Sequence, residues 1–162
     1  MTLRNIKKGL ILLTVIATMM ACGQSQGSQS APSKNEKQKI KNLLLSYGKA
    51  LNAASVKDVV PLFAENGVFM PAASLTAIGH DQIKSAFDDE FKNIKLNIAV
   101  IFDEIVQQGD FAYVRTRSKG TITILSKNIT MPTDKYRAFF VLEKVKGKWK
   151  IARFMFNFTS SL

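Results

Sequence analysis

The sequence predicts a single α+β domain behind a targeting segment, mainly because its hydrophobic period changes near Asn93. Before this residue, apolar side chains recur at three- and four-residue spacing, as in amphipathic helices. After it they alternate with period two, as in strands. Helices followed by a run of strands are typical of α+β folds. The 162 residues, less the targeting segment, suit one domain of ordinary size.

Residues 1–21 have the layout of a bacterial signal peptide. Three basic residues precede an apolar run over 10–20, which is shorter than the ~20 residues that a membrane-spanning helix needs. Residues 19–22, Met-Met-Ala-Cys, resemble a lipobox, and this resemblance implies that Cys22 is acylated after cleavage before it. The alternative is an ordinary signal peptide with an incidental cysteine.

The stretch over 22–36 predicts a flexible tether between this anchor and a domain over 37–162. It is rich in Gly, Ser and Gln and cannot bury a core. Gly23 stands where Asp would resemble an inner-membrane sorting signal. We therefore expect an extracytoplasmic, lipid-anchored protein, which in a Gram-negative cell lies in the outer membrane and faces the periplasm.

Three helices are expected in the first half of the domain. Residues 37–53 form an amphipathic helix whose lysines face water. Ser55 starts a capping box for a second helix, which Pro61 keeps short. A short strand over 67–71 ends in proline, and a loop then leads to a third helix over 82–92.

Four long strands are expected in the second half. Residues 96–106 and 111–125 pair across a turn at Gln108-Gly109 or at Gly109-Asp110. The last two strands form a hairpin over 136–158, with a two-residue turn at Lys146-Gly147. This register places Glu143 opposite Lys150 for an ion pair and Lys144 opposite Trp149 for a cation–π contact.

The hairpin over 136–158 is mostly apolar on both faces. Strict alternation puts Arg153 and Asn157 on the face of Phe140, and Phe154 on the other face. A solvent-facing antiparallel sheet alternates apolar with polar residues, so both faces should be covered. We expect helices and a possible ligand on one face and a second sheet or subunit, hence a homodimer, on the other.

Four segments resemble the NTF2-like superfamily, and within it the SnoaL-like and DUF4440 groups. They are SYGKALNAASVKDVVPLFAENGVFMP (46–71), IGHDQIKSAF (78–87), GDFAYVRTRSKG (109–120) and FFVLEKVKGKWKIARFMFN (139–157). The resemblance covers the chain from residue 37 to its end. It implies a cone in which three N-terminal helices pack in a strongly curved antiparallel sheet. It also implies a pocket between the two and frequent dimerisation through the sheet.

Ketosteroid isomerase, the best-known enzyme of this superfamily, uses one tyrosine and two carboxylates. The resemblance places Tyr47 at the tyrosine position. The carboxylate positions fall at Met70 or Pro71 and near residues 138–140, none of which can exchange a proton. We therefore assign no catalytic residue. Tyr47 is either a core residue or a single hydrogen-bond donor in the pocket.

The candidate ligand-binding residues of the implied pocket are Tyr47, Phe69, Phe87, Arg153 and Asn157. A buried guanidinium needs an acceptor, so Arg153 either pairs with a carboxylate, reaches the sheet edge or binds an anionic ligand. Asn157 either orients a ligand carbonyl or caps the end of its strand.

Composition argues against some partners. The single cysteine and single histidine cannot build a Cys/His zinc site, and we expect neither a metal nor a cofactor. The formal charge is +11, of which +8 lies beyond the targeting segment, and it favours anionic surfaces. Tyr113, Arg115 and Arg117 share a strand face, as in nucleic-acid binders, but we expect no nucleic acid for an extracytoplasmic protein.

Three functions are compatible with these features. The preferred one is a non-enzymatic lipoprotein whose cone binds a small apolar or anionic molecule or a protein partner. The second is a cofactor-independent SnoaL-like isomerase, cyclase or hydrolase, which a cavity carboxylate with a raised pKa would favour. The third is a structural dimer module, which a filled cone would favour.

Overall fold

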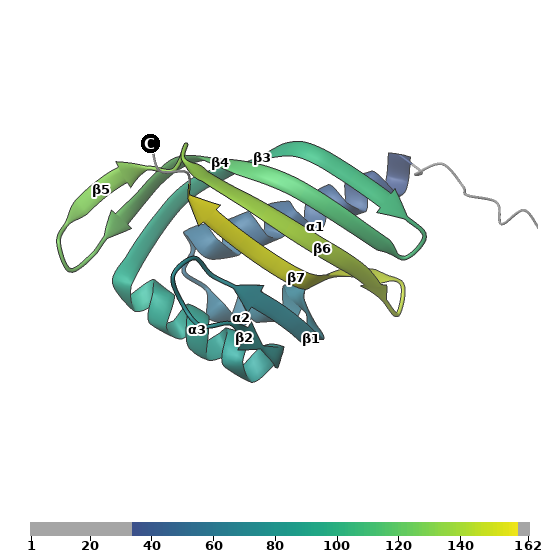
Figure 1. Cartoon of the computed structure of the whole chain (residues 1–162), viewed down its shortest axis with the longest axis horizontal. Helices are drawn as coiled ribbons and strands as arrows, with labels where there is room; N and C mark the ends of the chain where they lie inside the picture. Colours follow the sequence, from purple (N-terminus) through teal and green to yellow (C-terminus); the bar gives the residue numbers. More distant parts are fainter. Residues whose placement is uncertain (1–33, 159–162) are drawn as a thin grey trace, which may run out of the picture.

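A computed structural model describes residues 34–158, in which helices pack against a curved sheet (Figure 1). The expected α+β class is confirmed. The signal peptide, Cys22 and most of the expected tether lie outside the described residues. In chain order the elements are α1 (Lys34–Asn52), α2 (Val56–Val59), η1 (Val60–Leu62), β1 (Phe63–Met70), β2 (Ala77–Ile78), α3 (Gly79–Asn93), β3 (Ile94–Gln108), β4 (Phe111–Ile124), β5 (Ile129–Pro132), β6 (Tyr136–Val145) and β7 (Lys148–Phe158).

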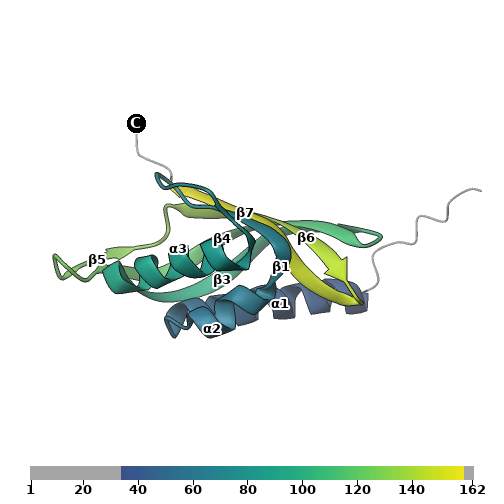
Figure 2. The same ribbon diagram turned by 90° about the horizontal axis from the view of Figure 1, so that it is seen from below.

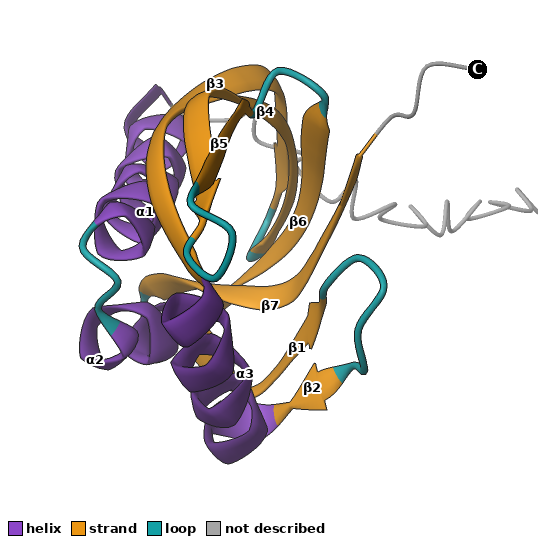
Figure 3. Cartoon of the chain, turned by 90° about the vertical axis from the view of Figure 1, so that its left-hand side faces the viewer, coloured by secondary structure: helices purple, strands orange, loops and turns teal. Residues whose placement is uncertain are grey.

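The sheet is mixed, not purely antiparallel as expected. Its order is β2-β1-β7-β6-β4-β3, with β5 added beside β4, and β1 runs parallel to β7. Most of the chain separates β1 from β7, so no short turn forces these two strands to be antiparallel. Figure 3 shows the long strands bending strongly, with α1 beside them and α3 below them in that view. The first helix begins at Lys34, so the expected tether overlaps it by residues 34–36.

Strong curvature comes from the two longest strands. β3 and β4 pair along their whole length across the turn Gly109-Asp110, the second of the two expected positions. In β4, Gly120 adopts φ +144°, and a Cβ there would clash with the carbonyl oxygen of Asn97. Only glycine tolerates this backbone next to its partner strand. Gly120 thus allows β4 to approach β3 closely at this point.

A row of stacked rings forms the centre of the core. Phe87, Phe69, Phe154 and Phe140 stack with centroid separations of 4.8, 5.2 and 4.4 Å and interplanar angles of 4°, 2° and 7°. The ring of Tyr47 meets Phe140 and Phe154 edge-on, at 5.8 and 5.3 Å. Such offset and edge-to-face pairs stabilise by about 0.5–1.5 kcal/mol each beyond the burial of their area. The row ties α3 to the sheet through β1, β7 and β6.

The turn of the β6–β7 hairpin is confirmed at Lys146-Gly147. Both residues have positive φ, +49° and +77°, as a two-residue turn of this kind requires. Lys144 Nζ lies 5.0 Å from the centre of the Trp149 ring, which confirms the cation–π contact. Glu143 is paired with Lys150 in register, but Lys150 Nζ donates to the Pro61 carbonyl at 2.5 Å. The expected ion pair between these two residues is therefore wrong.

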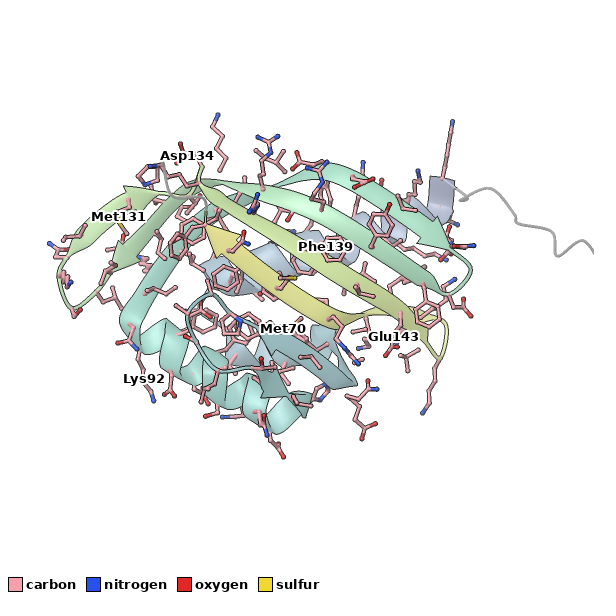
Figure 4. The ribbon with its side chains drawn as sticks, viewed as in Figure 1. Met70, Lys92, Met131, Asp134, Phe139 and Glu143 are labelled. Atoms are coloured by element: carbon pink, nitrogen blue, oxygen red, sulfur yellow. The ribbon has the colours of Figure 1, made fainter. Side chains whose placement is uncertain are left out.

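A β-bulge at Ala152 corrects the predicted faces of the hairpin. Leu142 pairs with Ile151 and Val141 with Arg153, so Ala152 is an extra residue in β7. Beyond the bulge every β7 residue lies on the face opposite to that of strict alternation. Phe154 consequently joins the core, where it is 5% exposed, and Arg153 lies on the outer face. Figure 4 labels Phe139 of β6, which lies on this outer face and pairs with Met155 of β7.

Candidate functional site

A cavity of about 860 Å³ lies between the helices and the concave face of the sheet. Its walls come from α1, α3, the loop between β1 and β2, and strands β3, β4, β6 and β7. Figure 2, seen from below, shows α1 and α3 below β7 in that view. The volume falls within the ~300–1,000 Å³ that is usual for small-molecule sites. An open cavity argues against a purely structural module with a filled cone.

Aromatic rings form the inner wall of the cavity. Tyr47, Phe69, Phe140 and Phe154 all line it, and all four are almost fully buried. Three of the four belong to the stacked row, and Tyr47 meets that row edge-on. A wall of this kind binds flat or branched apolar groups by dispersion and by exclusion of water.

Tyr47 contributes a polar group to this apolar wall. It lies mid-helix in α1, and only 3% of the residue is exposed. Its hydroxyl makes no hydrogen bond to another residue within 34–158. Burial, with the nearby charge of Glu90, raises the pKa of Tyr47 well above its usual value. The phenol is therefore neutral and has a free O–H donor for a group in the cavity.

Glu90 is another polar residue of the lining, and sequence reasoning missed it. It follows Ile83 by seven residues and Phe87 by three, so it shares their stripe on α3 and lines the cavity. Within residues 34–158 it has no ion-pair partner. Burial raises the pKa of Glu90 from 4.5 to about 7. The carboxyl is thus close to half protonated at neutral pH and can donate or accept a proton.

Of the three aromatic residues predicted for the pocket, two line the cavity and one lies behind its wall. Tyr47 and Phe69 line the cavity. Phe87 lies behind Phe69, stacked on it at 4.8 Å and 1% exposed, and does not reach the cavity. Phe87 therefore supports the wall without touching its contents. A ligand role for Tyr47 and Phe69 stays a prediction.

Arg153 and Asn157 do not face the cavity, and their expected placement is wrong. The bulge at Ala152 turns both side chains to the outer face, where both are exposed. The Arg153 guanidinium donates to the carbonyl of Ala152 at 2.7 Å and to that of Asn66 at 3.4 Å. Asn157 accepts a hydrogen bond from Arg137 Nε at 2.7 Å. With Phe87, three of the five predicted pocket residues thus do not line the cavity.

Two other arginines of the sheet, Arg115 and Arg117, are paired with carboxylates. Arg117 holds Asp103 by hydrogen bonds of 2.8–3.0 Å, and Arg115 lies 3.6 Å from both Asp103 and Glu104. The hydrogen bonds from Arg117 lower the pKa of Asp103 below its usual value. Within residues 34–158 no three His, Cys, Asp or Glu side chains are placed to share a metal ion. No helix of this part of the chain is long and apolar enough to span a membrane.

The helices, the curved mixed sheet and the cavity between them define an NTF2-like cone. The chain belongs to the SnoaL-like domain family, whose model matches residues 33–155. The search of curated proteins gives no match.

Solved structures show the same fold. A ketosteroid isomerase-like protein from Erwinia carotovora atroseptica is 27% identical, with a TM-score of 0.74, covering 79% of this chain and 99% of that chain. A conserved protein from Planctomyces limnophilus is 18% identical, with a TM-score of 0.65, covering 77% and 98%. An NTF2-like protein from Novosphingobium aromaticivorans is 15% identical, with a TM-score of 0.62, covering 79% and 84%.

Proposed function

We propose that the protein binds a small, mostly apolar molecule in the cavity of the cone, with a polar group of that molecule between Tyr47 and Glu90. The observation that carries this proposal is the aromatic-walled cavity of about 860 Å³ into which these two unpaired polar side chains face. Such a site gains affinity from apolar burial and orientation from a few polar groups.

A neutral ligand fits this cavity better than an anionic one. The arginine expected to attract an anion, Arg153, lies outside. Arg117 and Arg137 reach the cavity rim, but they are held by Asp103 and Asn157. An ionised Glu90 would also repel an anion. The Tyr47 hydroxyl and a protonated Glu90 both donate hydrogen bonds, so a ketone or ester oxygen is the best-matched polar group.

Native mass spectrometry and thermal unfolding test this proposal. Protein purified under mild conditions should carry a small molecule, or should be stabilised by one member of a library of apolar ketones. Ala86→Trp, which fills the cavity from α3, should abolish both effects, whereas Ala99→Trp on exposed β3 should not. If neither a retained molecule nor any thermal shift is found with the unmodified protein, the proposal fails.

We also propose that the protein is a lipoprotein held on the extracytoplasmic face of a membrane. The signal-peptide pattern of residues 1–21 and the lipobox-like Cys22 support this location. Cys22→Ser should move the protein from the membrane fraction to the soluble fraction and remove the acyl mass from its N-terminus. A variant that stays in the membrane fraction through stringent salt washing would contradict the anchor.

A second candidate function, proton transfer on a carbonyl substrate, is favoured by Glu90. A general base works best when its pKa is close to the working pH, and that of Glu90 is about 7. Its carboxylate would take a proton from the carbon next to a carbonyl, while the Tyr47 hydroxyl donates a hydrogen bond to the developing oxyanion. Returning the proton to another carbon gives an isomer. The likeness to an isomerase-like protein points to the same class of reaction.

Solvent deuterium exchange distinguishes catalysis from binding alone. With cyclohexanone in heavy water, the enzyme reading predicts faster exchange of the protons next to the carbonyl than in buffer. Glu90→Gln should remove this acceleration, and the exposed control Glu65→Gln should keep it. Equal exchange with and without the protein would leave binding as the function of the cavity.

A further inference from the structure

The end of the domain where the chain enters is built from three segments that lie far apart in sequence. In the first turn of α1, Glu36 accepts hydrogen bonds from Trp149 Nε1 and from Lys144 Nζ, both at 2.8 Å. The backbone N–H of Lys144 donates to the Asp110 carbonyl at 2.8 Å. The start of α1, the β6–β7 turn and the β3–β4 turn therefore meet, at the right in Figure 1. We call residues 34–41, 108–111 and 143–150 the tether end.

The tether end is strongly basic. It contains eight lysines and three acidic residues. Two of the three acidic residues, Glu36 and Asp110, form ion pairs with Lys39 and Lys144 of the same end. The excess of five positive charges is more than half of the net charge beyond the targeting segment. The eight residues are Lys34, Lys37, Lys39, Lys41, Lys144, Lys146, Lys148 and Lys150.

Apolar side chains are exposed among these lysines. Phe111, at the β3–β4 turn, is 62% exposed, and Val145, at the β6–β7 turn, is 39% exposed. Phe111 pairs with Glu143 across β4 and β6, and Val145 follows Glu143 by two residues on the same strand face. Exposed apolar side chains among lysines are the arrangement by which peripheral proteins lie on anionic lipid headgroups.

We propose that the tether end docks on an anionic lipid surface and holds the cavity mouth away from it. The 33 residues that precede α1 join the domain at this end, and their sequence has the pattern of a membrane-targeting segment. None of the residues that line the cavity belongs to the tether end. Docking there would leave the cavity accessible from the aqueous side.

The docking is tested with the unlipidated chain, so that the acyl group cannot account for binding. Residues 22–162 with Cys22→Ser keep the whole folded core, which lies within 34–158. We expect co-sedimentation with vesicles of phosphatidylcholine and phosphatidylglycerol at low salt, and its loss at high salt or with phosphatidylcholine alone. Equal binding to both vesicle types, or tighter binding to duplex DNA than to the anionic vesicles, would overturn the proposal.

Matched charge variants locate the surface. Replacing four lysines of the tether end by Gln should weaken vesicle binding by roughly fivefold per residue, or several hundredfold in all. Four exposed lysines elsewhere, replaced in the same way, carry the same charge loss and should change binding less than about fivefold. Equal losses in the two variants would contradict a local surface. The first set is Lys34, Lys37, Lys146 and Lys148, and the control set is Lys57, Lys95, Lys119 and Lys127.

Orientation is tested with one fluorophore at a time. In the Cys22→Ser background, a label at Lys146→Cys should be quenched by a quencher in the lipid headgroup. A label at Leu75→Cys, a fully accessible position on the cavity rim that is 92% exposed, should not be quenched. Equal quenching at both positions would refute the orientation. Phe111→Ser should weaken docking, whereas Leu125→Ser, an exposed position outside the tether end, should not.

Discussion

Replacing Glu90 with Gln should stabilise the protein at pH 8 and change it little at pH 4. The folded protein holds the Glu90 proton more tightly than the unfolded chain, because burial raises the pKa from 4.5 to about 7. The resulting stabilisation is fully present below pH 4.5 and is lost as the pH rises through 7. At about 1.4 kcal/mol per pKa unit, the loss amounts to about 3 kcal/mol. Gln resembles the protonated acid at every pH and avoids this loss.

Urea unfolding of both proteins at pH 4 and pH 8 measures the effect. Because the two proteins are compared in the same buffer, the titration of every other group cancels to first order. The exposed control Glu65→Gln should shift the free energy of unfolding by less than about 0.5 kcal/mol at both pH values. A Glu90→Gln variant that is no more stable than the parent at pH 8, or equally stabilised at both pH values, would refute the burial of a charged carboxylate in the cavity.

Three further predictions concern the frame of the cavity and the outer face. Gly120→Ala should destabilise the fold by about 2 kcal/mol or more, because its backbone and the contact with β3 admit no Cβ. Asn52→Asp should lose about 1 kcal/mol, because Asn52 both donates to and accepts from the backbone of β3 at 2.8 and 2.9 Å. If the predicted homodimer forms through the outer face, Phe139→Glu, at a residue 38% exposed, should give monomers in sedimentation.

Each of these has a control and a contradicting result. Gly109→Ala, at a turn where a Cβ meets nothing within 4 Å, should be less destabilising than Gly120→Ala. If Gly109→Ala were the more destabilising of the two, the close approach of β3 to Gly120 would be contradicted. Asn97→Asp, at an exposed position of β3, should leave the stability nearly unchanged. For the dimer, an unchanged sedimentation mass for Phe139→Glu would exclude that face. The hairpin pattern alone would have pointed to Phe154, which the structure buries.

Local signals in the sequence were sufficient for the fold class and the last hairpin, but not for the parallel pairing of β1 with β7. The period change near Asn93 predicted that the helices precede the long strands. The dipeptide Lys146-Gly147 predicted the turn of the last hairpin and the strand register beside that turn. Both signals act between near neighbours in the chain, so one sequence reveals them. Helical spacing put Tyr47 on the inward stripe of α1, and the family resemblance, not the spacing, put it among the pocket candidates; in the structure it lines the cavity.

Non-local features were missed. The bulge at Ala152 adds one residue to β7, and one residue reverses the face of Arg153 and Asn157. No residue type in that strand indicates a bulge. Glu90 was missed although it continues the stripe of Ile83 and Phe87, because a carboxylate on the core-facing stripe of a helix is unusual. A carboxylate in the apolar stripe of α3 was the sequence signal that could have indicated a polar group in the cavity.

Binding of an apolar ketone in the cavity is the most direct test of the central claim. Prodan, an uncharged naphthyl ketone, should increase and blue-shift its fluorescence on titration with the protein, in a saturable manner and at one equivalent. Ala86→Trp should abolish this signal while unfolding cooperatively, and Ala99→Trp should retain it. Equal, unsaturable signals from all three proteins would show that the cavity is not a binding site.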